Sequence, residues 1–215
     1  MISSGTALYA LTTAYADDWR LAMTPKVKLE DQRTIKYLDQ DQLRRFFDAI
    51  PPDAIRDRLL FGFMYRFGMR VSEVVGLPAK AVDAKRGEVT ITGLKNGLTR
   101  TYSLPSDLLK LVRKWKPSGD TFLDGRQGSL SRVRAYQLFR QYAKAAGIPK
   151  GFSPHSLRHS AAVHALDAGL STEEARDLLR HRRLATTDLY AAISTRRRGD
   201  YLKRLESSAA VVKLR

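Results

Sequence analysis

The chain has 215 residues, 43% of them hydrophobic, which is enough for one ordinary domain with a core and excludes a disordered basic tail. Its 38 Lys and Arg against 22 Asp and Glu give a net charge of +16, which favours a polyanionic partner, nucleic acid before anionic membrane. Cysteine is absent, no run reaches the roughly 20 apolar residues of a membrane span, and the first residues lack a secretion signal, so we expect a cytoplasmic protein without disulfides.

The first third of the chain is predicted to be helical. Residues 6–22 carry apolar side chains at helical spacing and lead into a polar, basic linker, so we treat residues 1–33 as a separate N-terminal segment of about one helix. Asp39 and Gln42 have the spacing of a capping box, which predicts a helix that ends at Pro51. Residues 53–67 form a strongly apolar pattern, which predicts a helix whose aromatic side chains belong to the core.

The middle of the chain contains the only clear β pattern. The run "EVTITGLKNGLTRTYSL", residues 88–104, has two β-rich halves around a Lys-Asn-Gly turn, which predicts a hairpin with Lys95 at or near its tip. After Asp124 we expect helices, broken at residues 147–154, near Gly169 and around Arg182. The fold class is therefore mainly α with a small antiparallel β-hairpin or sheet.

Basic residues are concentrated in the second half of the chain. Residues 125–166 hold seven Lys or Arg and no Asp or Glu, which predicts a face that meets phosphate, although a solvated basic helix is the alternative. Most of the residues that we predict to contact DNA lie in or just after this stretch. The predicted contacts are Arg100, Arg126, Arg132, Arg134, Arg140, Lys144, Arg180, Arg182 and Arg183.

Two further helix starts place candidate catalytic residues. Ser153 and Pro154 are a good N-cap and first-turn pair, so a helix that begins there places His155 and Arg158 on one face, beside backbone N–H groups that favour an anion. A second capping box, at residues 171–174, opens a helix that runs into His181. Taken singly, each histidine has an ordinary explanation as a surface or capped residue, and Tyr190 has one as a packing residue.

Taken together, these residues resemble the tyrosine recombinases, the family of phage integrases and Xer-type recombinases. The order and spacing of "GMRVSEVVGL" at 68–77, the hairpin lysine, "HSLR" at 155–158, "RH" at 180–181 and the tyrosine nine residues later carry the resemblance, which spans residues 34–195. It implies the catalytic-domain fold of that family. The catalytic residues that it implies are Arg70, Lys95, His155, Arg158, His181 and Tyr190, with Glu73 supporting the basic residues.

The chemistry of a phosphodiester explains why such residues would be needed. Two arginines match the geometry of the non-bridging oxygens and hold their charge through the transition state. Tyr190 is the implied nucleophile, His155 the candidate base, and Lys95 the general acid for the leaving 5′ oxygen, while His181 adds a hydrogen bond. The chain has neither a P-loop nor an acidic cluster that suits two magnesium ions, so we expect no metal and no cofactor.

The chain departs from the family pattern in two places. The family has glycine before its second-box histidine, whereas this chain has Arg180, which we expect to add a phosphate contact. The family's DNA-clamping domain has several helices, and residues 1–33 resemble at most its last helix and linker. We therefore expect either a truncated recombinase or a minimal one, similar in size to the fimbrial phase-variation invertases. We expect residues 196–215 to form a basic hinge and a tail helix that docks on another protomer on DNA; the alternative is a tail helix that packs on its own domain.

Three functions fit these observations. The first is a site-specific recombinase, an integrase or invertase of the kind found in mobile elements, that cleaves and rejoins double-stranded DNA through a 3′-phosphotyrosyl intermediate. The second is a topoisomerase-like enzyme that nicks and reseals one strand with the same chemistry. The third is a non-catalytic DNA-binding regulator of recombination sites.

Overall fold

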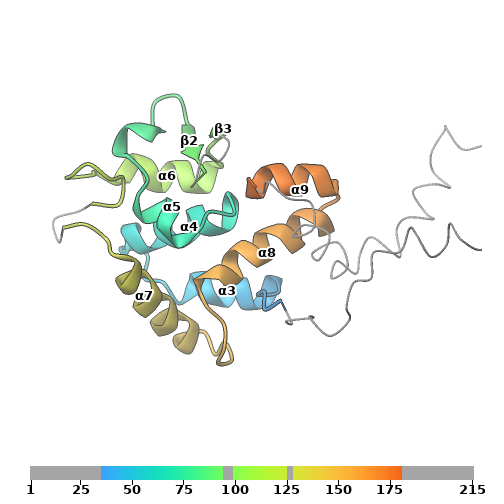
Figure 1. The fold of residues 1–215 in the computed structure, drawn as a ribbon. Helices are drawn as coiled ribbons and strands as arrows, with labels where there is room; N and C mark the ends of the chain where they lie inside the picture. The colour runs from blue at the N-terminus through green and yellow to red at the C-terminus, as the bar shows by residue number, and fades with distance from the viewer. Residues whose placement is uncertain (1–34, 94–98, 125–127, 181–215) are drawn as a thin grey trace, which may run out of the picture. The chain divides into compact units, whose positions relative to one another are not determined.

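The computed structural model describes residues 35–93, 99–124 and 128–180 (Figure 1). Backbone contacts divide the chain into two compact units, Met1–Ile35 and Lys36–Arg215, and the elements described below lie in the second. Among the described helices, none is long and apolar enough to cross a membrane.

The described part of the chain is mainly helical, as the sequence predicts. Its helices are α3 (Gln40–Asp48), α4 (Ile55–Arg66), α5 (Val71–Val75), α6 (Ser106–Lys114), α7 (Arg132–Ala145), α8 (Pro154–Asp167) and α9 (Thr172–Leu179), with a 3-10 turn, η2, at Ala79–Ala81.

One antiparallel sheet, ordered β1-β2-β3, accompanies the helices. Strands β2 (Glu88–Thr92) and β3 (Thr99–Ser103) pair with Val89 opposite Tyr102, which confirms the predicted hairpin on either side of residues 94–98. A further strand, β1 (Val82–Asp83), pairs with β2 and was not predicted. Two residues are too few to show the alternation of a strand, so only the tertiary structure reveals it.

The helix starts follow the capping residues. Asp39 accepts a hydrogen bond from the backbone N–H of Gln42 at 2.8 Å, Ser171 accepts one from that of Glu174 at 3.0 Å, and Ser153 caps α8 with Pro154 in its first turn. These three starts confirm the sequence prediction. The break that we expected around Arg182 begins earlier, because α9 ends at Leu179.

Helix α4 lies at the centre of the described helices and contacts α5, α6 and α8 (Figure 1). Its apolar residues from Leu59 to Met64 are buried on every side, as expected for a helix that packs against several neighbours. Phe61 packs edge-to-face on Phe46 of α3 at 5.2 Å between ring centroids, and Phe139 of α7 packs on Phe46 at 5.0 Å. The phenylalanines of this segment are therefore core residues, as predicted, whereas Tyr65 is partly buried and packs against the core.

The connection from α4 to α5, Phe67–Arg70, packs against the end of α9. Gly68 takes a positive φ of 55°, and a Cβ added there would lie 2.5 Å from Cδ2 of Leu179. A glycine is therefore required, both for the backbone conformation and for the close approach. The result is that the start of α5, Arg158 on the second turn of α8 and the last residue of α9 meet around this connection.

Candidate active site

The carboxylate of Glu73 lies at the centre of the candidate site, on the first turn of α5. Its side chain is 1% exposed. The backbone N–H of Arg70 donates to Oε2 at 2.8 Å, and Nη1 of Arg70 donates to Oε1 at 2.8 Å. The Arg70 side chain is 37% exposed, so Glu73 holds one side of a guanidinium that still faces solvent.

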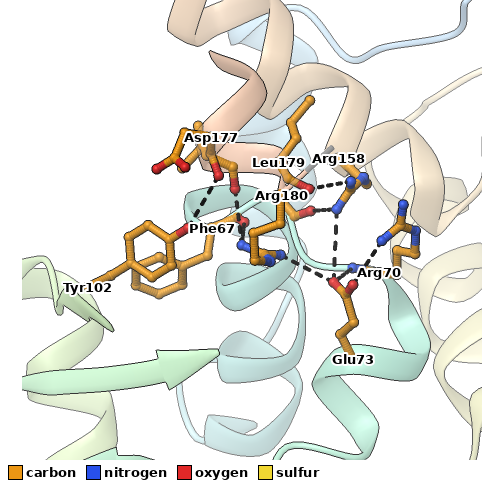
Figure 2. A network of polar contacts seen from close by, with 10 residues as sticks. Phe67, Arg70, Glu73, Tyr102, Arg158, Asp177, Leu179 and Arg180 are labelled. Carbon is orange, nitrogen blue, oxygen red and sulfur yellow. Dashed lines mark hydrogen bonds and ion pairs between the residues drawn. The ribbon is translucent and has the colours of Figure 1, made fainter. Parts of the chain in front are cut away.

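Arg158 reaches the same carboxylate from α8. Its side chain is 4% exposed, and Nη1 lies 3.9 Å from Oε2 of Glu73. Nη1 also donates to the carbonyl of Gly68, and Nη2 donates to that of Leu179 at 2.6 Å (Figure 2). Arg158 therefore ties the α4–α5 connection to the end of α9.

Arg180 is the third arginine on Glu73. Its Nη2 donates to Oε2 of Glu73 at 3.2 Å, and its Nη1 donates to the carbonyls of Phe67 and Leu178, both at 3.0 Å. The side chain is 0% exposed. We expected Arg180 to contact phosphate, but its guanidinium is buried and bonds the carboxylate of Glu73 instead (Figure 2).

The charges of this cluster are unequal. Burial alone would raise the pKa of Glu73, but the backbone N–H of Arg70 and the charges of Arg180, Arg158 and Arg70 hold that pKa below its usual value. Glu73 is therefore ionised at neutral pH, and three guanidiniums face one carboxylate. The described side chains of this cluster therefore carry more positive than negative charge, which favours an anion nearby.

A hollow of about 420 Å³ opens beside the cluster. It is lined by Arg70, Val71 and Ser72 at the start of α5, by Arg132, Val133 and Tyr136 of α7, and by His155 of α8. The hollow thus brings two predicted catalytic residues, Arg70 and His155, together with one predicted DNA contact, Arg132.

His155 is exposed on the first turn of α8, while Arg158 one turn later is buried. Partial desolvation and the nearby charges of Arg158 and Arg70 lower the pKa of His155, against a smaller opposing effect of Glu73. The imidazole is therefore neutral at physiological pH and able to accept a proton. His159, which sequence reasoning did not single out, follows at i+4, and burial together with His155 and Arg158 lowers its pKa to about 4.

The predicted DNA contacts on α7 lie on its surface. The structure exposes the side chains of Arg132, Arg134, Arg140 and Lys144. Arg100 on β3 is also exposed, but its Nη2 lies 3.0 Å from Oδ1 of Asp177, so it joins the sheet to α9. Six predicted site residues lie outside the described residues: Lys95, Arg126, His181, Arg182, Arg183 and Tyr190.

Comparison with known proteins identifies the family. Residues 36–197 match the phage integrase family, which is more than half of the chain. The chain belongs to this family. Tyrosine recombinase XerA of Pyrococcus furiosus is 32% identical over 169 residues, which cover 75% of this chain and 58% of that protein. Tyrosine recombinase XerD of Mycobacterium tuberculosis is 34% identical over 155 residues, which cover 66% of this chain and 50% of that protein. The chain thus spans less than two thirds of the length of these relatives.

Solved structures show the same fold. The crystal structure of XerA recombinase superposes with a TM-score of 0.67 at 22% identity, over 78% of this chain and 63% of that one. XerH recombinase, in a post-cleavage complex bound to a palindromic difH substrate, superposes with a TM-score of 0.66 at 21% identity, over 80% of this chain and 54% of that one. The predicted fold, mainly α with a small antiparallel sheet, is therefore confirmed as that of a phage integrase family catalytic domain.

Proposed function

We propose that this chain is the catalytic part of a site-specific DNA recombinase that cleaves and rejoins strands through a 3′-phosphotyrosyl intermediate. The observation that carries the proposal is the cluster of Arg70, Arg158 and Glu73 beside a hollow that also contains His155. This cluster supplies fixed positive charge and a neutral base at one place, which is what attack on a phosphodiester requires.

Arg70 and Arg158 hold the non-bridging oxygens of the scissile phosphate. Their guanidiniums are oriented in advance by Glu73 and by the carbonyls of Gly68 and Leu179, so little reorganisation accompanies the reaction. The proposed role of Arg70 agrees with its exposed side, which lines the hollow.

The remaining steps use residues assigned by family resemblance. The oxygen of Tyr190 attacks phosphorus, its proton passes to His155, and a tyrosine–phosphorus bond replaces the bond from phosphorus to the 5′ oxygen. Lys95 protonates that oxygen as it leaves, and His181 adds a hydrogen bond to the phosphate. The phosphotyrosyl bond conserves the energy of the phosphodiester, so a 5′ hydroxyl can reverse the step and reseal the strand without a nucleotide cofactor.

DNA contacts beyond the scissile phosphate come from α7. Its exposed Arg132 lines the same hollow as Arg70, and Arg134, Arg140 and Lys144 follow on the same helix. This placement supports a duplex that runs along α7 and presents one phosphate to the cluster, with Arg100, Arg126, Arg182 and Arg183 as further contacts.

We also propose that two protomers bind one DNA site. One structural neighbour is described as a lambda integrase dimer bound to a COC' core site, and it superposes with a TM-score of 0.60 at 19% identity over 84% of this chain and 51% of that one. We infer that this chain likewise assembles on double-stranded DNA in the cytoplasm, through its tail, residues 196–215.

The test is covalent attachment to DNA. Nicked duplexes taken from the DNA that flanks the gene trap a phosphotyrosyl product, because the cleaved end diffuses away. We expect the wild-type chain to shift such a duplex on a denaturing gel in excess chelator, and Tyr190→Phe to bind it without attaching. Attachment by the Phe variant contradicts the role of Tyr190.

The same material separates the alternative functions. Exchange between two paired sites indicates recombination, whereas relaxation of a supercoiled plasmid without paired sites indicates a topoisomerase-like enzyme. Binding by the wild-type chain without any covalent product indicates a non-catalytic regulator. The Tyr190→Phe chain is the control in each of these assays.

A further inference from the structure

The backbone at Arg180 has an unusual conformation. Arg180 follows the last residue of α9 with φ 53° and ψ 40°, and it is the one non-glycine residue with positive φ among residues 35–93, 99–124 and 128–180. After α7 and α8 the same left-handed region is occupied by Gly147 and Gly169. A side chain with a Cβ disfavours this conformation, so other contacts of Arg180 must hold it.

Those contacts are made by the buried guanidinium. Nη1 bonds the carbonyl of Phe67 on the α4–α5 connection and the carbonyl of Leu178 on α9, and Nη2 bonds Glu73. The left-handed turn at Arg180 and the inward path of its side chain therefore belong together (Figure 2). Together they hold the end of α9 against the start of α5.

These contacts of Arg180 affect Arg158 in two ways. The carbonyl that receives Nη2 of Arg158 belongs to Leu179, directly before the left-handed residue, so the turn sets its direction. In addition, Arg180 lies nearer to Oε2 of Glu73 than Arg158 does, at 3.2 Å against 3.9 Å. Arg180 thus takes up the negative charge of Glu73 that would otherwise cancel part of the charge of Arg158.

We propose that Arg180 is a positioning residue for the cleavage reaction: it orients Arg158 and offsets the charge of Glu73. This inference rests on the proposed function and deepens it. Arg180 touches neither the phosphate nor the nucleophile in this role.

The experiment compares substitutions of one residue. Arg180→Met keeps an apolar stem of similar length and removes the charge, whereas Arg180→Lys keeps the charge. Arg180→Gly removes the strain of the left-handed backbone conformation but also removes the guanidinium. Arg44→Met, at an arginine on α3 whose side chain is 71% exposed, is the matched control. Circular dichroism and thermal melting show which variants are folded.

The first readout is single-turnover covalent attachment to nicked DNA. For Arg180→Met and Arg180→Gly we expect the rate to fall by about tenfold to a hundredfold, as for misplacement of a phosphate-binding group, while DNA affinity changes by less than about threefold. Arg180→Lys restores part of the rate.

Two results of this rate measurement overturn the proposal. One is an unchanged rate in Arg180→Met. The other is a loss of DNA affinity as large as the loss of rate, which would make Arg180 a binding residue.

A second readout does not depend on cleavage. The NMR signal of the Nε–Hε group of Arg158, assigned with Arg158→Lys, should move in Arg180→Met and stay in place in Arg44→Met. If the wild-type chain attaches to no DNA, the proposed function fails, and this signal alone decides whether Arg180 orients Arg158. An unmoved signal then rejects the inference.

Discussion

Glu73→Gln tests whether the arginine cluster depends on one negative charge. The substitution keeps the shape of the side chain and one acceptor oxygen for the backbone N–H of Arg70, but removes the charge opposite three guanidiniums. We expect the folded chain to become less stable because Arg158 and Arg180 are almost completely buried and lose their counter-charge.

The size of the effect follows from burial. Removing one partner of a buried ion pair costs about 3–5 kcal/mol. Arg70 is 37% exposed and regains water, so its share is small, whereas Arg180 at 3.2 Å and 0% exposed carries most of the loss. We therefore expect the free energy of unfolding to fall by about 3 kcal/mol at pH 7. Glu88→Gln is the control, because Glu88 pairs with Arg86 on the surface. This substitution should change the free energy of unfolding by less than about 0.5 kcal/mol.

The dependence on pH distinguishes a charge effect from a packing effect. The pKa of Glu73 is lower in the folded chain than in the unfolded chain, so its contribution is complete above the unfolded pKa and is lost as pH falls through the folded one. Urea unfolding of both chains should show a constant difference between about pH 6 and 8 that shrinks below about pH 4.5. A difference under about 1 kcal/mol at pH 7, or one that persists undiminished to about pH 3, refutes the reasoning.

Two further predictions concern residues outside the described part of the chain. Lys95→Ala should slow attachment to ordinary DNA but lose far less on a substrate with sulfur at the 5′ bridging position, because sulfur leaves without protonation; equal losses on both substrates would make Lys95 a binding residue. Deletion of residues 200–215 should leave attachment at a single site intact and reduce cooperative binding to paired sites in a gel-shift titration, whereas unchanged cooperativity in a folded protein contradicts docking through the tail.

Much of the fold could be predicted from the sequence because its signals are local. Asp39 with Gln42 and Ser171 with Glu174 satisfy backbone N–H groups within one turn, so the same pairs appear as capping boxes in the structure. The apolar run of α4 needed only its composition to be recognised as core. Strand β1 depends on pairing with β2, which no local pattern of two residues encodes.

The site could be predicted only in part, because its geometry depends on contacts between residues far apart in the sequence. Family resemblance selected Arg70, Glu73 and Arg158, and the structure brings them together. It also selected His155, whose place beside Arg70 in the hollow depends on α7 and on packing between helices. The basic stretch after Asp124 includes the exposed arginines of α7, and their contact with phosphate stays a prediction. Arg180, which we predicted as a phosphate contact because it replaces the family's glycine, is buried instead.

Three of the described residues that break local rules meet at one place. Arg180 adopts a left-handed backbone conformation, Arg158 buries a charge on α8, and Glu73 buries the opposite charge on α5. Each is unfavourable by itself, but each is held by contacts with the others and with the carbonyls of the α4–α5 connection. Local reasoning fails here because the residues position one another, and such failures are expected where function rather than folding sets the sequence. Three arginines surround one carboxylate, so this place carries more positive than negative charge, as the proposed phosphate site requires.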